Sequence, residues 1–286
     1  MRFMADEKGT LYLCATPIGN LGDVSSRLLE ILETVDLIAA EDTRQTLKLL
    51  NRFGITKAMT SYHEHNKKAK GEYLVKLLMG GKNIAQVSDA GTPAISDPGE
   101  DLVRLCIEND ITVTSVPGAV AGINALILSG LSTSRYAFEG FLSVNKRHRH
   151  EHLNSIKNDT HTLIFYEAPH KLKTTIDDMR TVFGGERRIA LARELTKIHE
   201  EIIRTTLDGA AELYSEKSPR GEYVIVVEGA KARSDEAECF WETMSIKEHV
   251  EKYIAEGMSS KDAVKAAAGD RKLPKREVYN EYHKEG

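Results

Sequence analysis

The amino-acid sequence predicts an α/β fold with two domains and a small helical tail. Short apolar runs alternate with segments of helical periodicity over the first 130 residues, and loops rich in Gly and Pro follow those runs. The 286 residues also exceed a single domain of about 100–150 residues. Continuous apolar strands that alternate with helices are typical of a parallel sheet with both faces covered.

The first domain is expected over residues 9–134. Ser25 or Ser26 is suited to cap its first helix, and Gly54 is suited to end the second. The strands are expected at residues 11–15, 35–40, 83–87 and 112–116, and the helices at 25–34, 43–53, 67–79, 99–109 and 119–129. Strand and helix alternate throughout, so the N-terminal sheet should be mainly parallel.

The second domain is expected over residues 135–230, with its first helix in the polar, basic stretch 143–152. Further strands are expected at 160–166, 187–192, 200–205 and 222–227, and helices at 170–182 and 210–216. This mixture of strand–strand and strand–helix steps predicts a mixed sheet. A polar, linker-like stretch then leads to a small helical appendage over residues 240–286, with helices at 246–255, 260–268 and 275–282.

Composition restricts the function classes. A net charge of −4 and an aromatic content of 6% count against a surface that grips long nucleic acid. Three basic segments, at residues 67–70, 146–150 and 271–276, nevertheless offer local phosphate contacts, although solvated faces explain each of them singly. The three cysteines show no CxxC spacing, so neither a disulfide framework nor a zinc site is expected. The sequence lacks a secretory signal core and an apolar run of about 18 residues, so we expect a soluble, cytoplasmic protein that does not engage membranes.

Three loops follow predicted strands and should lie together at the carboxyl edge of the parallel sheet, where such folds bind ligands. The loop Ser88–Pro93 is the strongest candidate, because its Gly and other small residues allow close approach of a ligand to the backbone. Residues 17–23 lack the Lys of a phosphate-binding loop, and a tight turn explains them equally well. Residues 115–122 fit either a helix N-terminus facing a ligand or close helix–sheet packing.

Charged residues also gather at other predicted strand ends. Residues 41–44 place two carboxylates beside an arginine, which a helix cap with an exposed ion pair also explains. His63 and His65 are two residues apart, a poor spacing for metal ligands on one helix face. We therefore expect no metal site.

Seven segments resemble, in chain order, the tetrapyrrole methylase superfamily, and within it the members that methylate small-subunit ribosomal RNA. The two longest are Leu-Tyr-Leu-Cys-Ala-Thr-Pro-Ile-Gly-Asn-Leu-Gly-Asp at 11–23 and Ser-Asp-Ala-Gly-Thr-Pro-Ala-Ile-Ser-Asp-Pro-Gly at 88–99. The others lie at 40–44, 116–119, 138–142, 165–172 and 192–195, and the helical tail is similar as well. Tetrapyrrole-making relatives carry Gly-Asp-Pro where this chain has Ala-Gly-Thr-Pro, which argues against a porphyrin-type substrate.

The resemblance implies a tetrapyrrole-methylase-like fold with S-adenosyl-L-methionine as the methyl donor and no metal. It implies 2'-O-methylation of a cytidine ribose in the decoding region, with 16S rRNA or the 30S ribosomal subunit as partner. It also implies a homodimer whose subunits hold the donor in the cleft between two domains. The residues implied at the donor pocket are Pro17, Ser88, Asp89, Ala90, Gly91, Thr92, Ser115, Ala119, Leu142, Tyr166, Ala192 and Arg193.

A ribose 2'-hydroxyl is a weak acid, so a general base would help the transfer. Our candidates are Glu139, Asp89 and Glu167, because each lies in a motif expected near the cleft. Arg193 and Arg44 are candidates to orient a phosphate. Two other function classes stay open at this point. One is a small-molecule methyltransferase acting on a tetrapyrrole or a modified amino acid, and the other is a non-catalytic RNA-binding module that uses only the tail.

Overall fold

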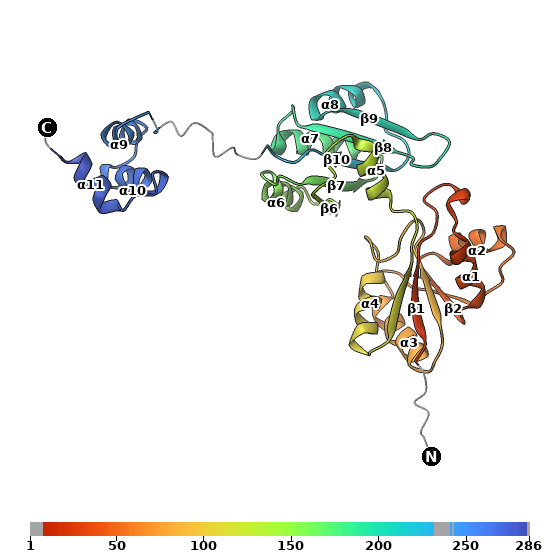
Figure 1. Ribbon diagram of the computed structural model, residues 1–286. Helices are drawn as coiled ribbons and strands as arrows, with labels where there is room; N and C mark the ends of the chain where they lie inside the picture. The colour runs from red at the N-terminus through yellow and green to blue at the C-terminus, as the bar shows by residue number, and fades with distance from the viewer. Residues whose placement is uncertain (1–7, 232–240, 242, 285–286) are drawn as a thin grey trace, which may run out of the picture. The chain divides into compact units, whose positions relative to one another are not determined.

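The computed structural model describes residues 8–231, 241 and 243–284. They form two compact units, one ending at Ala230 and the other starting at Lys231, and each is described by itself. The first unit contains two five-stranded sheets (Figure 1). The predicted division of this unit at residue 134 stays a prediction.

The first sheet has the strand order β3-β2-β4-β1-β5, and all of its pairs are parallel. Its strands are β1 (Thr10–Cys14), β2 (Leu37–Ala40), β3 (Met59–Ser61), β4 (Ile84–Val87) and β5 (Thr112–Val116). The prediction of a mainly parallel N-terminal sheet is confirmed. The edge strand β3 had not been predicted, because its three half-buried residues are too few to show a period.

Helices cover both faces of this sheet. Strand side chains alternate: Ile38 and Ala40 face α1 (Ser26–Thr34) and α2 (Thr43–Arg52), while Ala39 faces α3 (Lys67–Met79) and α4 (Gly99–Glu108). Local sequence sets the helix bounds as expected. The Ser25 side chain accepts a hydrogen bond from the backbone N–H of Leu28 and so caps α1.

The second sheet has the order β6-β7-β10-β8-β9, with β6 parallel to β7 and the other pairs antiparallel. The predicted mixed sheet is therefore confirmed. Its strands are β6 (Tyr136–Phe141), β7 (Thr162–Glu167), β8 (Arg188–Arg193), β9 (Glu201–Thr206) and β10 (Tyr223–Val227). Strand β6 had not been predicted, and its pairing with β7 shifts register between Phe138 and Gly140, where Gly140 adopts a φ of 64°.

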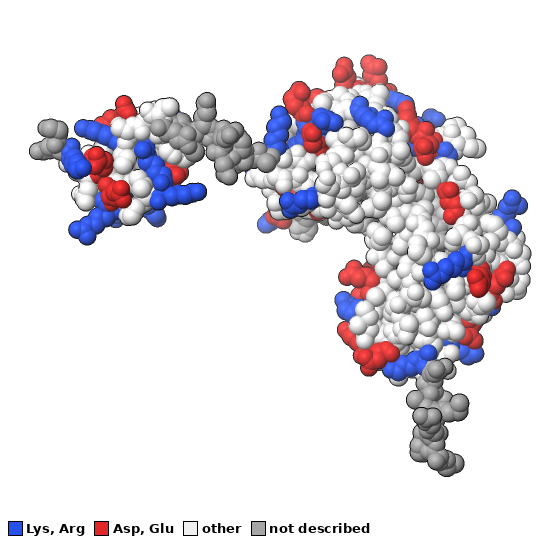
Figure 2. Space-filling view, viewed as in Figure 1, with Lys and Arg blue, Asp and Glu red and all other residues white. Residues whose placement is uncertain are grey.

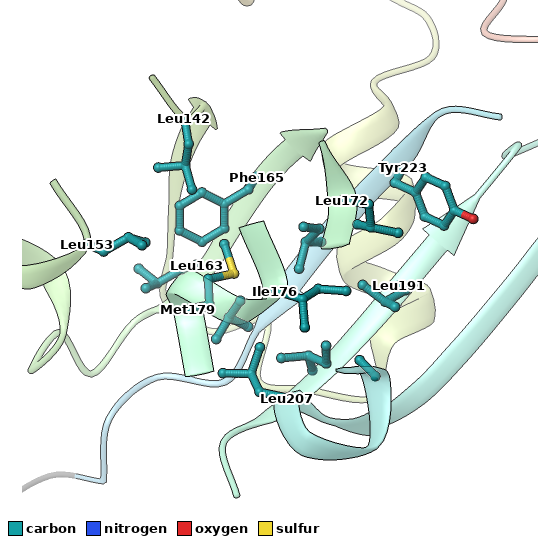
Figure 3. Packing of buried hydrophobic residues seen from close by; sticks show 14 of the residues in the cluster. Leu142, Leu153, Leu163, Phe165, Leu172, Ile176, Met179, Leu191, Leu207 and Tyr223 are labelled. Atoms are coloured by element: carbon teal, nitrogen blue, oxygen red, sulfur yellow. The ribbon is translucent and has the colours of Figure 1, made fainter. Parts of the chain in front are cut away.

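One face of the second sheet carries the largest core of the unit (Figure 3). Phe165, Leu191 and Ile225 point from the strands into this core. The helices that cover it are α6 (Lys146–Ile156), α7 (Leu172–Phe183) and α8 (Leu207–Glu216). Burial of each large apolar side chain stabilises the fold by about 1.5–3 kcal/mol, so this face fixes the sheet firmly.

The opposite face of the second sheet is covered by α5 (Ala121–Ser129), which comes from the first half of the chain. Ala125 and Leu126 pack against Ile164, Ala190 and Val224. Ile18, from the loop after β1, joins the same cluster. The loop after β1 therefore packs with α5 against the strands of the second sheet.

The second unit consists of α9 (Ile246–Ala255), α10 (Ser260–Asp270) and α11 (Lys275–Tyr282). Val250, Val264 and Val278 lie in its small buried cluster. Ser245 and Glu248 form a capping box at the start of α9. Arg271 donates to the backbone carbonyls of Trp241 and Met244, so this basic residue ties the helices together. The prediction that the C-terminal tail is helical is confirmed.

Candidate active site

A cavity of about 630 Å³ lies at the carboxyl edge of the first sheet and is walled by both halves of the first unit. That volume is in the range of small-molecule and cofactor sites. The first half contributes Ile18, Glu41, Ser88–Thr92, Ile95–Asp97, Val120 and Ala121; the second half contributes Phe141, Tyr166–His170, Ala192, Glu194, Leu195, Lys197 and Glu222–Val224. Most of these residues follow or end a strand, as the sequence predicted for the binding edge.

The loop after β4 forms one wall of the cavity, and short contacts fix its shape. Gly91 exchanges two backbone hydrogen bonds with Thr16, of 2.9 and 3.1 Å, and its carbonyl also accepts from the Ser88 hydroxyl at 3.1 Å. The Thr92 hydroxyl donates to the Ala119 carbonyl at 3.0 Å. Gly91 has a φ of 84°, and a Cβ there would lie 3.1 Å from Ile18 Cγ2 and 3.3 Å from the Ala119 carbonyl oxygen. Glycine is therefore required at the closest approach of this loop to its neighbours.

Backbone conformations of positive φ gather in two loops at this cavity. Ala94 and Ser96 have φ values of 68° and 64°, and Glu194 and Thr196 have values of 50° and 65°. Such conformations cost about 1 kcal/mol or more for a residue with a side chain, and they cluster at functional sites. The strain supports a ligand-binding role for both walls.

Three carboxylates lie at the first-sheet side of the cavity. Asp89 Oδ1 accepts from the Asp42 backbone N–H at 2.9 Å, and Glu41 Oε2 accepts from the Asp89 backbone N–H at 3.3 Å. Burial raises the pKa of Glu41, and the negative charges of Asp89 and Asp97 raise it further. Burial also raises the pKa of Asp97, whose carboxylate accepts from the Gly99 and Ala94 backbone N–H groups. Together they form a negative pocket suited to a cationic ligand.

The opposite wall contains an apolar strip beside the charged Glu194, Lys197 and Glu222. Ala192 and Val224 line it from neighbouring strands β8 and β10. The Tyr166 hydroxyl accepts from the Gly122 backbone N–H at 3.1 Å, which joins the start of α5 to β7. Burial raises the pKa of Tyr166, so its hydroxyl stays protonated. This wall can enclose a flat ring while the opposite wall presents charge.

The structure brings most of the implied donor-pocket residues to this cavity. Ser88, Asp89, Ala90, Gly91, Thr92, Tyr166 and Ala192 line it. Ala119 lies behind the loop as the acceptor for Thr92, and Ser115 is exposed near the end of β5. Leu142 does not line the cavity, because it packs in the main core beside Phe165 (Figure 3). Arg193 pairs with Glu201 at 2.7 Å and does not line the cavity either.

The three candidate bases have different surroundings. Asp89 is exposed and faces the cavity. Glu167 also lines the cavity but is buried, and its carboxylate accepts from the Thr175 hydroxyl at 2.6 Å and from the Ala168 backbone N–H at 2.8 Å. Glu139 lies outside the lining and pairs with His152 at 2.8 Å. The surroundings of Glu167 and Glu139 are those of groups that hold local structure, so Asp89 is the carboxylate most available to a substrate.

A second, smaller cavity of about 260 Å³ adjoins the first. Pro17, implied at the donor pocket, lines this cavity instead. Ser88 and Asp89 line both cavities and so separate them. The other wall comes from α2 and includes Gln45, Lys48 and Arg52. These α2 residues were not among the predicted site residues, although the four-residue spacing of the two cations places them on one helix face.

Some cations of the basic segments predicted from the sequence form ion pairs with carboxylates of the same chain. Lys67 contacts Glu64 and Asp101, and Arg147 contacts Glu151. Arg44 contacts Asp42 at 2.6 Å. In the view of Figure 2, Lys and Arg are interspersed with Asp and Glu and do not gather into one field. Lys67 and Arg147 are therefore less available for phosphate contacts than their sequence segments suggest.

Within residues 8–231, 241 and 243–284, no three His, Cys, Asp or Glu side chains are placed to hold a metal ion. In the same part of the chain, no helix has the length and apolar character to cross a bilayer. Cys14 and Cys106 are buried and unpaired, and burial raises the pKa of these thiols to about 12 and about 11. Neither is a reactive thiolate at neutral pH.

Comparisons with known proteins agree with this geometry. Residues 10–211 match the family model described as Tetrapyrrole (Corrin/Porphyrin) Methylases. A relative from Halalkalibacterium halodurans, named ribosomal RNA small subunit methyltransferase I, is 51% identical over 98% of this chain and 96% of its own length. The protein of the same name from Bacillus subtilis is 48% identical over 97% of this chain and 95% of its own length.

Solved structures share the fold. The methyltransferase CobJ superposes with a TM-score of 0.60 at 16% identity, over 79% of this chain and 96% of its own. Uroporphyrin-III-C-methyltransferase from Thermus thermophilus gives 0.55 at 17% identity, over 77% of this chain and 94% of its own. A structure of the Thermus enzyme complexed with S-adenyl homocysteine gives 0.54 at 13% identity, over 77% of this chain and 97% of its own.

Proposed function

Because the chain belongs to the tetrapyrrole (corrin/porphyrin) methylases, and within them to the ribosomal RNA small subunit methyltransferases I, we propose that it methylates the ribose 2'-hydroxyl of a cytidine in the decoding region of 16S rRNA, with S-adenosyl-L-methionine as donor. The protein is a methyltransferase that acts on ribosomal RNA. The observation that carries the finer proposal is the pair of adjoining cavities separated by Asp89. A donor in one and an acceptor in the other would meet at this residue.

The larger cavity fits the donor in size, shape and charge. Its apolar wall of Ala192, Val224 and Ile18 suits an adenine ring. The negative pocket of Glu41, Asp89 and Asp97 suits a molecule with a sulfonium and an ammonium group. Among the described residues, the backbone N–H groups of Ala90 and Thr92 have no partner, so they are free to bind the donor.

Bound S-adenosylmethionine supplies a methyl group on a positively charged sulfur. The task of the protein is then to align the attacking oxygen with that methyl group and to remove the hydroxyl proton. Asp89 is held by the Asp42 backbone N–H and faces both cavities, so its carboxylate can accept the proton. Removal of the hydroxyl proton makes the ribose oxygen a better nucleophile.

Methyl transfer to 30S subunits from cells that lack the enzyme tests the proposal. With radiolabelled donor, we expect label in 16S rRNA, and alkaline hydrolysis should leave it in a single dinucleotide that begins with cytidine. A 2'-O-methyl group blocks alkaline cleavage of the adjacent phosphodiester, whereas a base methyl group does not. Label in mononucleotides would contradict the 2'-O assignment, and absence of label from rRNA would favour a small-molecule acceptor.

The RNA acceptor is favoured over a tetrapyrrole by the two relatives that match almost the full chain. The proposed partner is 16S rRNA or the 30S subunit, which places the reaction in the cytoplasm. No membrane contact enters the proposal. The non-catalytic alternative, an RNA-binding module that uses only the tail, is not retained, because the family match covers residues 10–211.

We also propose that the protein acts as a homodimer. Large apolar side chains are exposed on two elements that pack in or on the second sheet: Ile123 and Ile127 on α5, and Tyr136 and Phe138 on the edge strand β6. Exposed apolar groups of this kind are typical of protein interfaces. Light scattering should give twice the 31.8 kDa mass of the chain. The Ile127→Asp variant should shift the mass toward the monomer, and an unshifted dimer would place the interface elsewhere.

A further inference from the structure

The smaller cavity has an open cationic side formed by α2. Arg44, Lys48 and Arg52 follow one another at four-residue spacing on this helix, and all three are exposed. The helix contains no Asp or Glu, so its ten residues carry a charge of +3. With a rise of about 1.5 Å per residue, the three positions extend over about 12 Å of helix. We call these three residues the α2 ridge.

The three ridge cations repel one another, although Arg52 lies in the last turn, where the helix dipole favours a positive charge. Like charges four residues apart destabilise a helix by about 0.2–0.5 kcal/mol per pair. Asp42 neutralises Arg44, but among the described residues no carboxylate pairs with Lys48 or Arg52. Lys48 donates to the side-chain oxygen of Gln45 at 3.1 Å. Two exposed, unneutralised cations beside a cavity are a feature that a polyanionic ligand would explain.

The geometry points to this cavity and the α2 ridge as the site of the acceptor nucleotide, an inference that rests on the proposed function. We propose that Lys48 and Arg52 contact backbone phosphates of a single-stranded RNA segment. The target nucleotide leaves its stack and enters the smaller cavity, as in other enzymes that modify nucleotides. Its ribose then reaches the wall of Ser88 and Asp89 that borders the donor cavity.

Because the whole chain has a net charge of −4, RNA binding depends more strongly on local cations such as those of the α2 ridge. The protein as a whole does not attract RNA, so phosphate binding must depend on a few placed cations. Lys48 and Arg52 adjoin the proposed reaction centre through the cavity that they line, whereas Arg147 and Lys67 are held in internal ion pairs. Phosphate contacts fix the register of a strand, which is what selection of one nucleotide requires.

The test compares two double variants that change charge equally. Lys48→Gln/Arg52→Gln removes the two ridge cations that have no carboxylate partner, and Lys173→Gln/Lys217→Gln removes two exposed lysines, one in the first turn of α7 and one directly after α8. Equilibrium binding to protein-free 16S rRNA and to 30S subunits is measured against salt concentration. The binding constant falls as salt rises, and we expect the ridge variant to make this fall less steep, reducing the magnitude of the slope of log K against log salt by about 2. The control should leave the slope unchanged.

The ridge variant should also raise the KM for the RNA substrate by roughly tenfold or more, with unchanged affinity for S-adenosylmethionine. A ridge variant that behaves like the control would overturn the inference. So would weaker binding to 30S subunits with unchanged binding to protein-free 16S rRNA, because a ribosomal protein would then be the partner. Failure of the wild-type protein to methylate or bind rRNA would instead count against the proposed function itself.

Discussion

Asp89→Asn is expected to slow methyl transfer from bound donor by roughly 10²–10⁴-fold, the usual contribution of a general base. The substitution removes the proton acceptor at the wall between the two cavities. It keeps a side-chain oxygen that can accept from the Asp42 backbone N–H, so the loop should hold its shape. Donor affinity should change by no more than about tenfold, since one hydrogen bond contributes about 0.5–1.5 kcal/mol.

Single-turnover methylation separates this effect from substrate binding. The other two candidates serve as matched controls, each changed from Glu to Gln. Glu139→Gln should slow the reaction by less than about tenfold, because its carboxylate pairs with His152 away from the cavity. Glu167→Gln should act chiefly on stability, because both of its oxygens hold groups of the chain itself. Changes below tenfold for all three carboxylates would show that alignment alone drives the reaction.

Arg149→Leu is expected to lower the free energy of unfolding by about 3 kcal/mol, the low end of the cost of breaking a buried ion pair. The side chains of Arg149 and Asp178 are 9% and 11% exposed, and their closest atoms lie 2.6 Å apart. Arg149 also donates to the Ser143 and Val144 carbonyls and so ties the loop after β6 to α7. His150 keeps its 2.8 Å contact with Asp178, which limits the loss.

A neighbouring arginine provides the control for this prediction. Arg147 is 84% exposed and pairs with Glu151 four residues along the same helix. Arg147→Leu should change stability by less than about 0.5 kcal/mol, as exposed helix pairs do. Chemical denaturation of both variants gives the comparison. Equal effects of the two substitutions would show that the buried pair contributes no more than a surface contact.

The difference in unfolding free energy between the wild type and Arg149→Leu should also depend on pH. Burial alone would raise the pKa of Asp178, but the hydrogen bonds from Arg149 and His150 outweigh it and hold the pKa below its ordinary value. A lowered folded-state pKa gives stability that is complete above the unfolded value of about 3.9 and is lost as pH falls through the folded value. The gap between wild type and Arg149→Leu should therefore narrow in acid, and a gap that widens would contradict the assignment.

Most of the fold followed from local sequence, because strands and helices alternate with clear punctuation. Lys67–Met79 was predicted to the residue, since an apolar face ends there at a Gly-Gly pair. The packing of α5 on the second sheet was not predictable from its own period. Its residues are apolar on most sides, so the pattern does not show which sheet it covers.

Some of the predicted site residues lie outside the cavity, and strand geometry explains two of these errors. Successive strand residues face opposite sides, so an error of one position moves a residue out of the site. Ala192 lines the cavity, whereas its neighbour Arg193 points to the other face and pairs with Glu201. Phe141 lines the cavity, whereas Leu142 packs in the core, after a register shift at Gly140 that the sequence does not show.

The central claim is that the donor lies in the larger cavity and meets the acceptor across Asp89. A crystal structure with S-adenosylmethionine tests it most directly. We expect the donor against the loop Ser88–Thr92 and the wall of Ala192 and Val224, with its methyl group directed toward Asp89 and the smaller cavity. A donor bound in the smaller cavity beside Lys48 and Arg52, or one whose methyl group points away from Asp89, would contradict the account.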